Sequence, residues 1–358
     1  MSGDSFGRIF KLTTFGESHG PGLGGVVQGC PAGIFLDEGT IQKEMDMRKP
    51  GHGPASTRRR ESDKVKILSG VFEGKTTGTA IGFYISNEDQ RSRDYSKIRD
   101  VYRPGHGDIT YDVKYGFRDY RGGGRASGRE TASRVAAGAI AQAFLEKKGM
   151  SVLAYTVELG GIRAGFKSRD EIFKNGFACP DPDVVPTWEE LVKECKNKGD
   201  SLGGVVEIVA KGVPAGLGEP VFDKIDARLA CALMGVGAVK GVEIGRGFDA
   251  ARLRGSENND CLTKDGFVSN NSGGILAGIS SGQPVIARAA VKPIPSISKT
   301  QKTITSQGAE IEISIGGRHD ISAIPRIVPV LKAMFMLVLA DMYLLHRSRK
   351  DIFRRPVL

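Results

Sequence analysis

Two histidines lie in short glycine-containing turns, a setting that leaves an imidazole reachable from solvent. His19 stands in Gly16-Glu-Ser-His-Gly20, and His106 stands in Arg103-Pro-Gly-His-Gly-Asp108. A histidine has a usual pKa near 6.5, so it can give or take a proton at neutral pH. The chain has only five histidines, and two in such turns indicate acid–base chemistry. A solvated loop histidine is the alternative at each position.

A third motif, Arg121-Gly-Gly-Gly-Arg-Ala-Ser-Gly-Arg-Glu-Thr131, combines a glycine-rich loop with arginines. Ser127 and Glu130 have the spacing of a capping box, which predicts that Ser127 is the N-cap of the long helix that follows. Backbone N–H groups and the positive dipole end favour a phosphate or carboxylate there, and Arg125 and Arg129 add charge. The alternative is an ordinary capped helix with solvated arginines.

A fourth motif, Gly316-Gly-Arg-His-Asp320, follows a predicted strand over residues 311–314. A carboxylate held beside cations stays ionised and can accept a proton. Asp320 is therefore a candidate base, with a plain surface ion pair as the alternative.

Positive charge is concentrated in one part of the chain. Lysine and arginine number 51 against 41 acidic residues, a net charge of +10, and residues 41–134 hold 20 of these cations and 13 of the acids. Most arginines in that window stand beside Gly, Pro, Ser or Thr, which predicts loops. Because a guanidinium pairs bidentately with carboxylate or phosphate, this pattern favours a small ligand with several negative charges. Aromatic residues make up only 7%, which argues against a nucleic-acid surface.

The elements that must position these motifs alternate without a strict βαβ rhythm, which favours a mixed α+β fold. Because the chain contains no long linker, we expect a single domain over residues 1–358. Hydrophobic periodicity predicts a helix from Ser127 to Gly149. Further helices are expected over 38–47, 188–198, 223–234 and 327–347. Strands are predicted over 64–68, 80–86, 152–159, 205–213, 287–291 and 311–314.

Cysteine usage indicates a reducing compartment, so we expect a cytoplasmic protein. The five cysteines form no Cys-x-x-Cys pair, which argues against a disulfide framework and against a zinc site. The most apolar stretch lies near the C-terminus, but its longest uncharged run is 333–340. That run is too short to cross a bilayer, and we expect no membrane span.

Two other functions fit parts of the sequence. The segment Gly70-Val-Phe-Glu-Gly74-Lys75-Thr76 resembles a phosphate-binding P-loop, but it has three residues between its glycines where that motif has four. A phosphotransferase using Lys75 is one alternative. A basic RNA- or polyanion-binding protein without catalysis is another; it predicts strongly salt-dependent binding.

The four motifs occur together, and in this order, in the chorismate synthase family, which the chain resembles over nearly its whole length. Further matching segments are 66–74, Asp89-Gln-Arg-Ser92 and 212–222. The resemblance implies a single-domain β-α-β sandwich that assembles as a homotetramer. It also implies the last step of the shikimate pathway towards aromatic amino acids, a 1,4-anti elimination of phosphate from 5-enolpyruvylshikimate 3-phosphate that gives chorismate.

The resemblance further implies a requirement for reduced FMN, although the reaction has no net redox change. In the family the flavin is thought to donate electron density transiently to the substrate, and the protein supplies orientation and charge. Some members reduce their flavin with NADPH through extra segments. This compact chain resembles the members that depend on an external flavin reductase, with NADPH as an indirect reductant.

Residue roles follow from the same resemblance. His19 matches the family's histidine beside the leaving phosphate, His106 the one near the flavin pyrimidine ring, and Asp320 the carboxylate near flavin N5, which is suggested to help that nitrogen take the C6 proton. Substrate-binding positions match Ser18, Arg48, Arg103 and Arg129. FMN contacts match Arg125, Ala126, Ser127, Gly237, Ala238, Ala277, Lys292, Pro293, Ile294, Pro295, Ser296 and Arg318.

The chain departs from the family pattern at a few of these places. Pro54 replaces a frequent arginine, for which Arg58 is a candidate substitute. Gly237 and Ala277 stand where Asn and Gly are commoner. Ile321-Ser322 follow Asp320 where Pro-Cys is usual, and we expect little effect on Asp320 itself.

Overall fold

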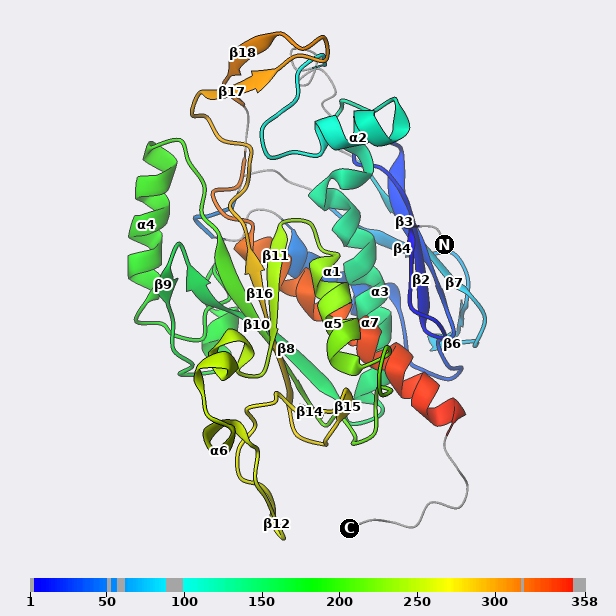
Figure 1. Cartoon of the computed structure of the whole chain (residues 1–358). Helices are drawn as coiled ribbons and strands as arrows, with labels where there is room; N and C mark the ends of the chain where they lie inside the picture. Colours follow the sequence, from blue (N-terminus) through cyan, green and yellow to red (C-terminus); the bar gives the residue numbers. More distant parts are fainter. Residues whose placement is uncertain (1–2, 50–52, 57–61, 88–98, 317–318, 350–358) are drawn as a thin grey trace.

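The protein is a sandwich of two antiparallel sheets with helices between them, as the computed structural model shows (Figure 1). The structure describes residues 3–49, 53–56, 62–87, 99–316 and 319–349. Both sheets have five strands, in the orders β1-β2-β3-β7-β4 and β11-β16-β10-β8-β9. The predicted α+β class and the β-α-β sandwich are confirmed.

The first sheet is built from the N-terminal part of the chain. Its strands are β1 (Ser5–Phe6), β2 (Lys11–Gly16), β3 (Gly22–Gln28), β4 (Val65–Ile67) and β7 (Ile81–Ser86). In β7 the side chains alternate between buried and partly exposed, so one face packs on the core. The predicted strands at 64–68 and 80–86 are confirmed, with slightly shorter bounds.

The second sheet comes from the C-terminal part. Its strands are β8 (Ser151–Leu159), β9 (Ile162–Arg163), β10 (Gly204–Lys211), β11 (Val239–Ile244) and β16 (Val285–Val291). Further short strands pair into two-stranded sheets: β5 (Val71–Phe72) with β6 (Lys75–Thr76), β12 (Leu262–Thr263) with β13 (Gly266–Phe267), β14 (Ile275–Leu276) with β15 (Ile279–Ser280), and β17 (Gln301–Ile304) with β18 (Glu310–Ile313). The P-loop-like segment is thus the β5–β6 hairpin, where the Lys75 ammonium lies over the Phe35 ring.

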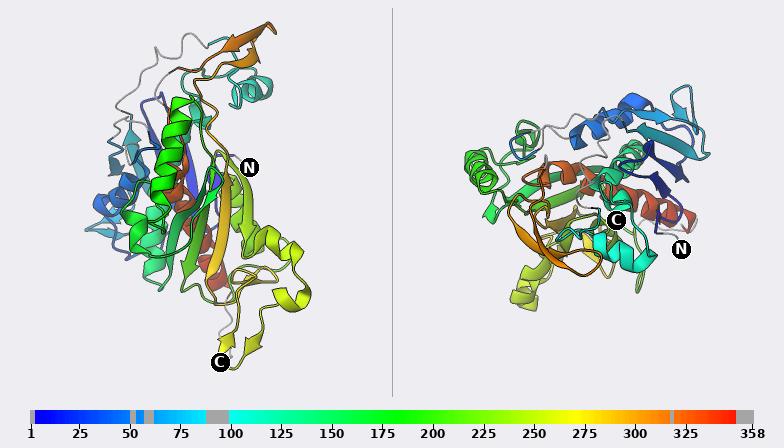
Figure 2. Two further views of the ribbon diagram at one scale, coloured as in Figure 1. Left: turned by 90° about the vertical axis from the view of Figure 1, so that its left-hand side faces the viewer. Right: turned by 90° about the horizontal axis from the view of Figure 1, so that it is seen from above.

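Three helices fill the space between the two large sheets (Figure 2). They are α1 (Glu38–Arg48), α3 (Thr131–Glu146) and α7 (Ile324–Ser348). α3 packs on α7, which also contacts β8 and β10, while α3 reaches β2 and β3 of the other sheet. α5 (Ile225–Met234) packs on α7 and β11. The remaining helices are α2 (Asp108–Tyr115), α4 (Val185–Asn197) and α6 (Gly255–Asn258).

The most apolar helix, α7, belongs to the core. It is 25 residues long and apolar enough to cross a membrane by length and composition, so the expectation that this stretch is too short was wrong. However, 83% of its most apolar stretch is buried inside the protein, which is the environment of a core helix. Asp341, within α7, accepts hydrogen bonds from the backbone N–H groups of Ile9 and Phe10 at 2.7 and 3.0 Å. The helix therefore anchors the N-terminal segment.

Candidate active site

A cavity of about 460 Å³ collects residues from the four sequence motifs. Its lining includes His19, His106, Asp320 and the segment 126–131. α3 and α7 both begin at this cavity, since Thr131, Ala323 and Arg326 also line it. Two positive helix ends therefore face the same space, which favours anionic ligands.

The glycine-rich motif approaches the first histidine very closely. Gly122 has φ +66°, and a Cβ atom built there would lie 2.2 Å from Cε1 of His19. A side chain at this position would displace the imidazole, so glycine is required. His19 Nδ1 also shares a hydrogen bond of 3.0 Å with Ser18 Oγ, and both residues line the cavity.

The start of the long helix differs from the predicted capping box. Ser127 caps a 3₁₀ turn, Gly128–Glu130, and its Oγ accepts the Arg129 N–H at 3.3 Å. The α-helix begins only at Thr131, and the Glu130 carboxylate pairs with Arg134 at 2.9 Å. The tighter turn presents Gly128 and Arg129 to the cavity.

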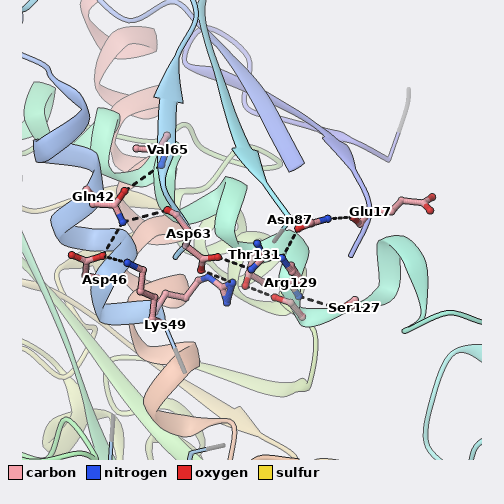
Figure 3. Close-up of polar contacts among 12 residues, drawn as sticks. Glu17, Gln42, Asp46, Lys49, Asp63, Val65, Asn87, Ser127, Arg129 and Thr131 are labelled. Atoms are coloured by element: carbon pink, nitrogen blue, oxygen red, sulfur yellow. Dashed lines mark hydrogen bonds and ion pairs between the residues drawn. The ribbon is translucent and has the colours of Figure 1, made fainter. Parts of the chain in front are cut away.

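Two arginines of the lining share one buried carboxylate. Arg48 Nη2 and Arg129 Nη1 lie 3.3 and 2.6 Å from the two oxygens of Asp63, whose side chain is 0% exposed. Arg129 Nε also donates to Asn87 Oδ1 at 2.7 Å. We call Arg48, Asp63, Asn87 and Arg129 the arginine cluster; Figure 3 shows its contacts around Asp63 and Arg129.

A second group surrounds His106. Its Nε2 shares a hydrogen bond of 2.8 Å with Ser296 Oγ, and Lys292 Nζ donates to the Gly105 carbonyl at 3.1 Å. Burial is the main reason that the pKa of His106 falls to about 4, and the positive charges of Arg103 and Lys292 lower it further. His106 is therefore neutral at pH 7. We call His106, Ser296, Lys292, Arg103 and Asp108 the His106 cluster.

Arg103 does not line the cavity, although it was predicted to bind substrate. Its guanidinium donates to both oxygens of Asp108, at 2.8 Å each, and its backbone N–H donates to the same carboxylate at 3.0 Å. Asp108 also pairs with Arg118 at 3.2 Å. This ion-pair network closes the motif around His106 just where α2 begins, an element that the sequence patterns did not predict.

Asp320 reaches the cavity beside the start of α7. Its Oδ2 accepts from Arg326 Nη1 at 3.0 Å, and its Oδ1 accepts from Ser56 Oγ at 3.4 Å. The next residue, Ile321, donates its N–H to the Ala55 carbonyl at 2.8 Å. The Ile321-Ser322 departure therefore still leaves the backbone beside Asp320 fixed.

The predicted FMN contacts are divided between places. The cavity is lined by Ala126, Ser127, Gly237, Ala238, Lys292, Ile294 and Pro295. Ser296 is not a lining residue, but it shares a hydrogen bond with His106, which is one. Pro293 is not among the lining residues. Arg125 lines a second, wider cavity of about 1320 Å³, where it pairs with Asp4 at 2.9 Å.

Two further FMN predictions concern Ala277 and Arg318. Ala277 lies in the β14–β15 hairpin, at the end of the molecule remote from α2 in Figure 1, and it does not line the cavity. Arg318 lies outside the described residues, as do Arg58 and the segment Asp89–Ser92.

Sequence reasoning missed several lining residues, among them Ser62, Asn87 and Arg326. Arg326 is in the first turn of α7, six residues after Asp320, so its spacing from that motif was a usable signal. Among the described residues, no hydrogen-bond partner is found for its buried Nε. Asp63 and Asn87 belong to none of the four motifs; Asn87 is identified by its place in the cavity lining, and Asp63 by its contact with Arg129.

Comparisons with known proteins agree on one family. The family model described as chorismate synthase matches residues 10–344. Among curated proteins, the chorismate synthases of Maridesulfovibrio salexigens and Oleidesulfovibrio alaskensis are 67% and 64% identical to this chain. Each alignment covers 97% of this chain, with 99% and 98% of the relative. A crystal structure of chorismate synthase matches with a TM-score of 0.75 and 32% identity, over 97% of this chain and 95% of that one.

Proposed function

The chain belongs to the chorismate synthase family, and we propose that the 460 Å³ cavity is its active site. The chain is a carbon–oxygen lyase that converts 5-enolpyruvylshikimate 3-phosphate to chorismate by 1,4-anti elimination of phosphate. In this reaction the C–O bond to phosphate and a C–H bond at C6 break, and a new double bond forms. The proposal is supported by one observation above all: His19, His106, Asp320, Arg48 and Arg129 line, or lie at, a single cavity.

The substrate carries a phosphate and two carboxylates, and the arginine cluster has the chemistry to bind them. A guanidinium presents a planar fork that matches carboxylate or phosphate bidentately. Arg48 and Arg129 come from two helix ends and converge on the cavity. We assign substrate binding to Ser18, Arg48 and Arg129, and we add Arg326. Arg103 acts through Asp108 to shape the loop that carries His106.

Proton transfers are assigned to three side chains. His19, held by Ser18 and enclosed by Gly122, would donate a proton to the departing phosphate. Asp320, held by Arg326 and Ser56, would receive the proton released from C6. His106 is neutral at pH 7, so it would act by hydrogen bonding and would become cationic only beside a new negative charge.

The family is flavin-dependent, and the residues at one side of the cavity fit a flavin. A Cβ atom built on Gly237 meets nothing within 4 Å, so open space adjoins that loop. The cavity volume is in the range of small-molecule sites, and its lining includes Ala126, Ser127, Ala238 and Lys292. Reduced FMN, when bound, would supply transient electron density that eases the departure of phosphate. Lys292 and His106 would favour a negatively charged ring, and Ile294 and Pro295 would exclude water.

The deciding experiment measures chorismate and inorganic phosphate after the purified protein is given the substrate and chemically reduced FMN without oxygen. We expect both products in equal amounts, and no products with oxidised FMN. Binding of labelled RNA without product formation would instead favour the polyanion-binding alternative. A lyase that forms no phosphate under these conditions would refute the assigned site.

The remaining features are proposals with their own tests. We propose that the protein is a homotetramer, to be checked by light scattering on the purified chain. We propose that FMN is reduced by a separate flavin reductase, so that NADPH alone sustains no turnover until such an enzyme is added. We also propose a cytoplasmic location, supported by five free cysteines.

A further inference from the structure

We propose that Asp63 and Asn87 are positioning residues that fix the two substrate-binding arginines relative to each other and to His19. Neither side chain is among the residues assigned to catalysis or binding above. The inference rests on the proposed function of the cavity. Figure 3 shows Asp63 and Asn87 meeting at Arg129.

Asp63 acts on the two arginines at once. One carboxylate oxygen lies 2.6 Å from Arg129 Nη1, and the other lies 3.3 Å from Arg48 Nη2. The carboxylate is 0% exposed, and the Arg48 and Arg129 side chains are 1% and 11% exposed. Two guanidinium groups this close repel each other when buried, and a shared carboxylate offsets that repulsion. Their directions are therefore set before any ligand arrives.

The backbone at Asp63 is itself fixed in an unusual conformation. Its φ is +45°, a left-handed value that Asp and Asn tolerate better than other side chains. Gln42 of α1 donates to the Asp63 carbonyl at 3.3 Å and accepts from the Val65 N–H at 3.2 Å. Because Arg48 ends the same helix, α1 holds both the carboxylate and one of the two arginines.

Asn87 connects the arginines to the loop of the catalytic histidine. Its Oδ1 accepts from Arg129 Nε at 2.7 Å. Its Nδ2 donates to the carbonyls of Glu17 and Gly20, both at 2.8 Å. These two carbonyls flank Ser18 and His19, so one amide group sets the distance between Arg129 and the proposed proton donor.

These contacts give each residue a different expected kinetic signature. Among the described residues, the Asp63 carboxylate forms ion pairs only with Arg48 and Arg129, whose proposed role is to bind the substrate. Loss of its charge should therefore raise KM and leave kcat nearly unchanged. Asn87 touches Arg129 and the His19 loop, so its loss should raise KM and also lower kcat.

The first test is Asp63→Asn. Asparagine has nearly the same side-chain shape as aspartate and also tolerates the left-handed backbone conformation at this position. The amide offers one acceptor oxygen where the carboxylate offers two, so one guanidinium faces an NH₂ group. We expect KM for 5-enolpyruvylshikimate 3-phosphate to rise about tenfold, with kcat within about threefold of the wild type. The matched control is Asp249→Asn, which removes an exposed carboxylate paired with Arg252. A KM within twofold of the wild type, or an equal rise in the control, would overturn the role of Asp63.

The second test is Asn87→Ala, which keeps the inference testable if Asp63→Asn fails to fold. We expect KM to rise about fivefold and kcat to fall about tenfold, whereas Asn197→Ala on the exposed end of α4 leaves both unchanged. Thermal unfolding of every variant is compared with the wild type. A lower melting temperature with unaltered KM and kcat would show a purely structural role and would overturn the inference.

The two proposals fail in distinguishable ways. If the wild type forms no chorismate with reduced FMN, the proposed function fails, and with it the positioning inference that rests on that function. If the wild type is active and both variants keep wild-type KM and kcat, only the positioning inference fails. Equilibrium binding of the substrate to the oxidised FMN complex gives a second readout, in which Asp63→Asn should bind about tenfold more weakly.

Discussion

The arginine cluster and the His106 cluster each contribute lining residues to one cavity, yet their basic groups respond differently to burial. Arg48 and Arg129 are almost fully buried and keep their charge, because a guanidinium is not deprotonated in proteins and Asp63 neutralises part of it. His106 is partly buried, and its pKa falls to about 4. Asp108 raises that pKa, but burial together with Arg103 and Lys292 outweighs it.

This difference shows how one cavity can hold two kinds of ligand group. A permanent positive charge suits the phosphate and carboxylates of the substrate, which stay ionised throughout the reaction. A neutral imidazole suits a ring whose charge changes, since it can hydrogen-bond to the neutral form and be protonated beside the anion. Side chains that line the same cavity thus differ in charge because burial and intrinsic basicity differ between a guanidinium and an imidazole.

The largest effect is expected at Asp320, which belongs to neither cluster and is assigned to proton transfer. Asp320→Asn keeps an acceptor for Arg326 but cannot take a proton, so kcat should fall a hundredfold or more while KM changes little. Steady-state kinetics with reduced FMN measures this. An unchanged kcat would show that Asp320 does not transfer the proton, and the two clusters would then be assigned to ligand binding alone.

A pH titration of stability tests the His106 cluster. The pKa of His106 is about 4 in the folded protein and near 6.5 in the unfolded chain, so the unfolded chain binds the proton more readily. Above pH 6.5 His106 is neutral in both states and does not destabilise the fold. As the pH falls from 6.5 towards 4, the free energy of unfolding decreases by up to about 3 kcal/mol. Denaturant unfolding of wild type and His106→Asn between pH 4 and 8 checks this. Parallel curves for the two proteins would contradict it.

A smaller effect is expected when the fork of one arginine is removed but its charge is kept. Arg129→Lys loses the simultaneous contacts of Nε with Asn87 and of Nη1 with Asp63. We expect KM to rise about tenfold and the pH dependence of stability to stay unchanged. Substrate kinetics and a pH titration of unfolding together separate this variant from His106→Asn, and a shifted titration would argue that the clusters are coupled.

The smallest effect is expected at the other end of α1, away from the cavity. Asp37 caps this helix, and its carboxylate accepts the Thr40 N–H at 2.6 Å. Asp37→Ala should lower the free energy of unfolding by about 1 kcal/mol and leave KM unchanged. Chemical denaturation and kinetics measure the two effects. A raised KM would mean that α1 transmits strain to Arg48, so that the arginine cluster is less rigid than proposed.

Much of the fold could be predicted from local patterns. The helix predicted over 38–47 is α1, and the apolar residues after Ser127 form α3. Helix α2 was missed because it is only eight residues long and packs little apolar surface on the core; Asp108 is its one buried residue. The helix predicted over 327–347 is α7, but its apolar stretch was judged too short to cross a membrane because Arg326, Lys332 and Asp341 interrupt it. In the fold, Lys332 pairs with Glu44, and Asp341 binds backbone N–H groups.

By itself, the sequence determined the chemistry that is available: histidines between glycines, loop arginines, an aspartate in the last motif, and the family in which these occur together. Only the tertiary structure decided which of these groups meet. In the folded protein Arg103 pairs with Asp108, Arg125 lines a different cavity, and both Asp63 and Asn87 contact Arg129. The physical reason is that glycine turns and residue types are local properties. The pairing of buried charges depends on distances between segments that only the packed sandwich fixes.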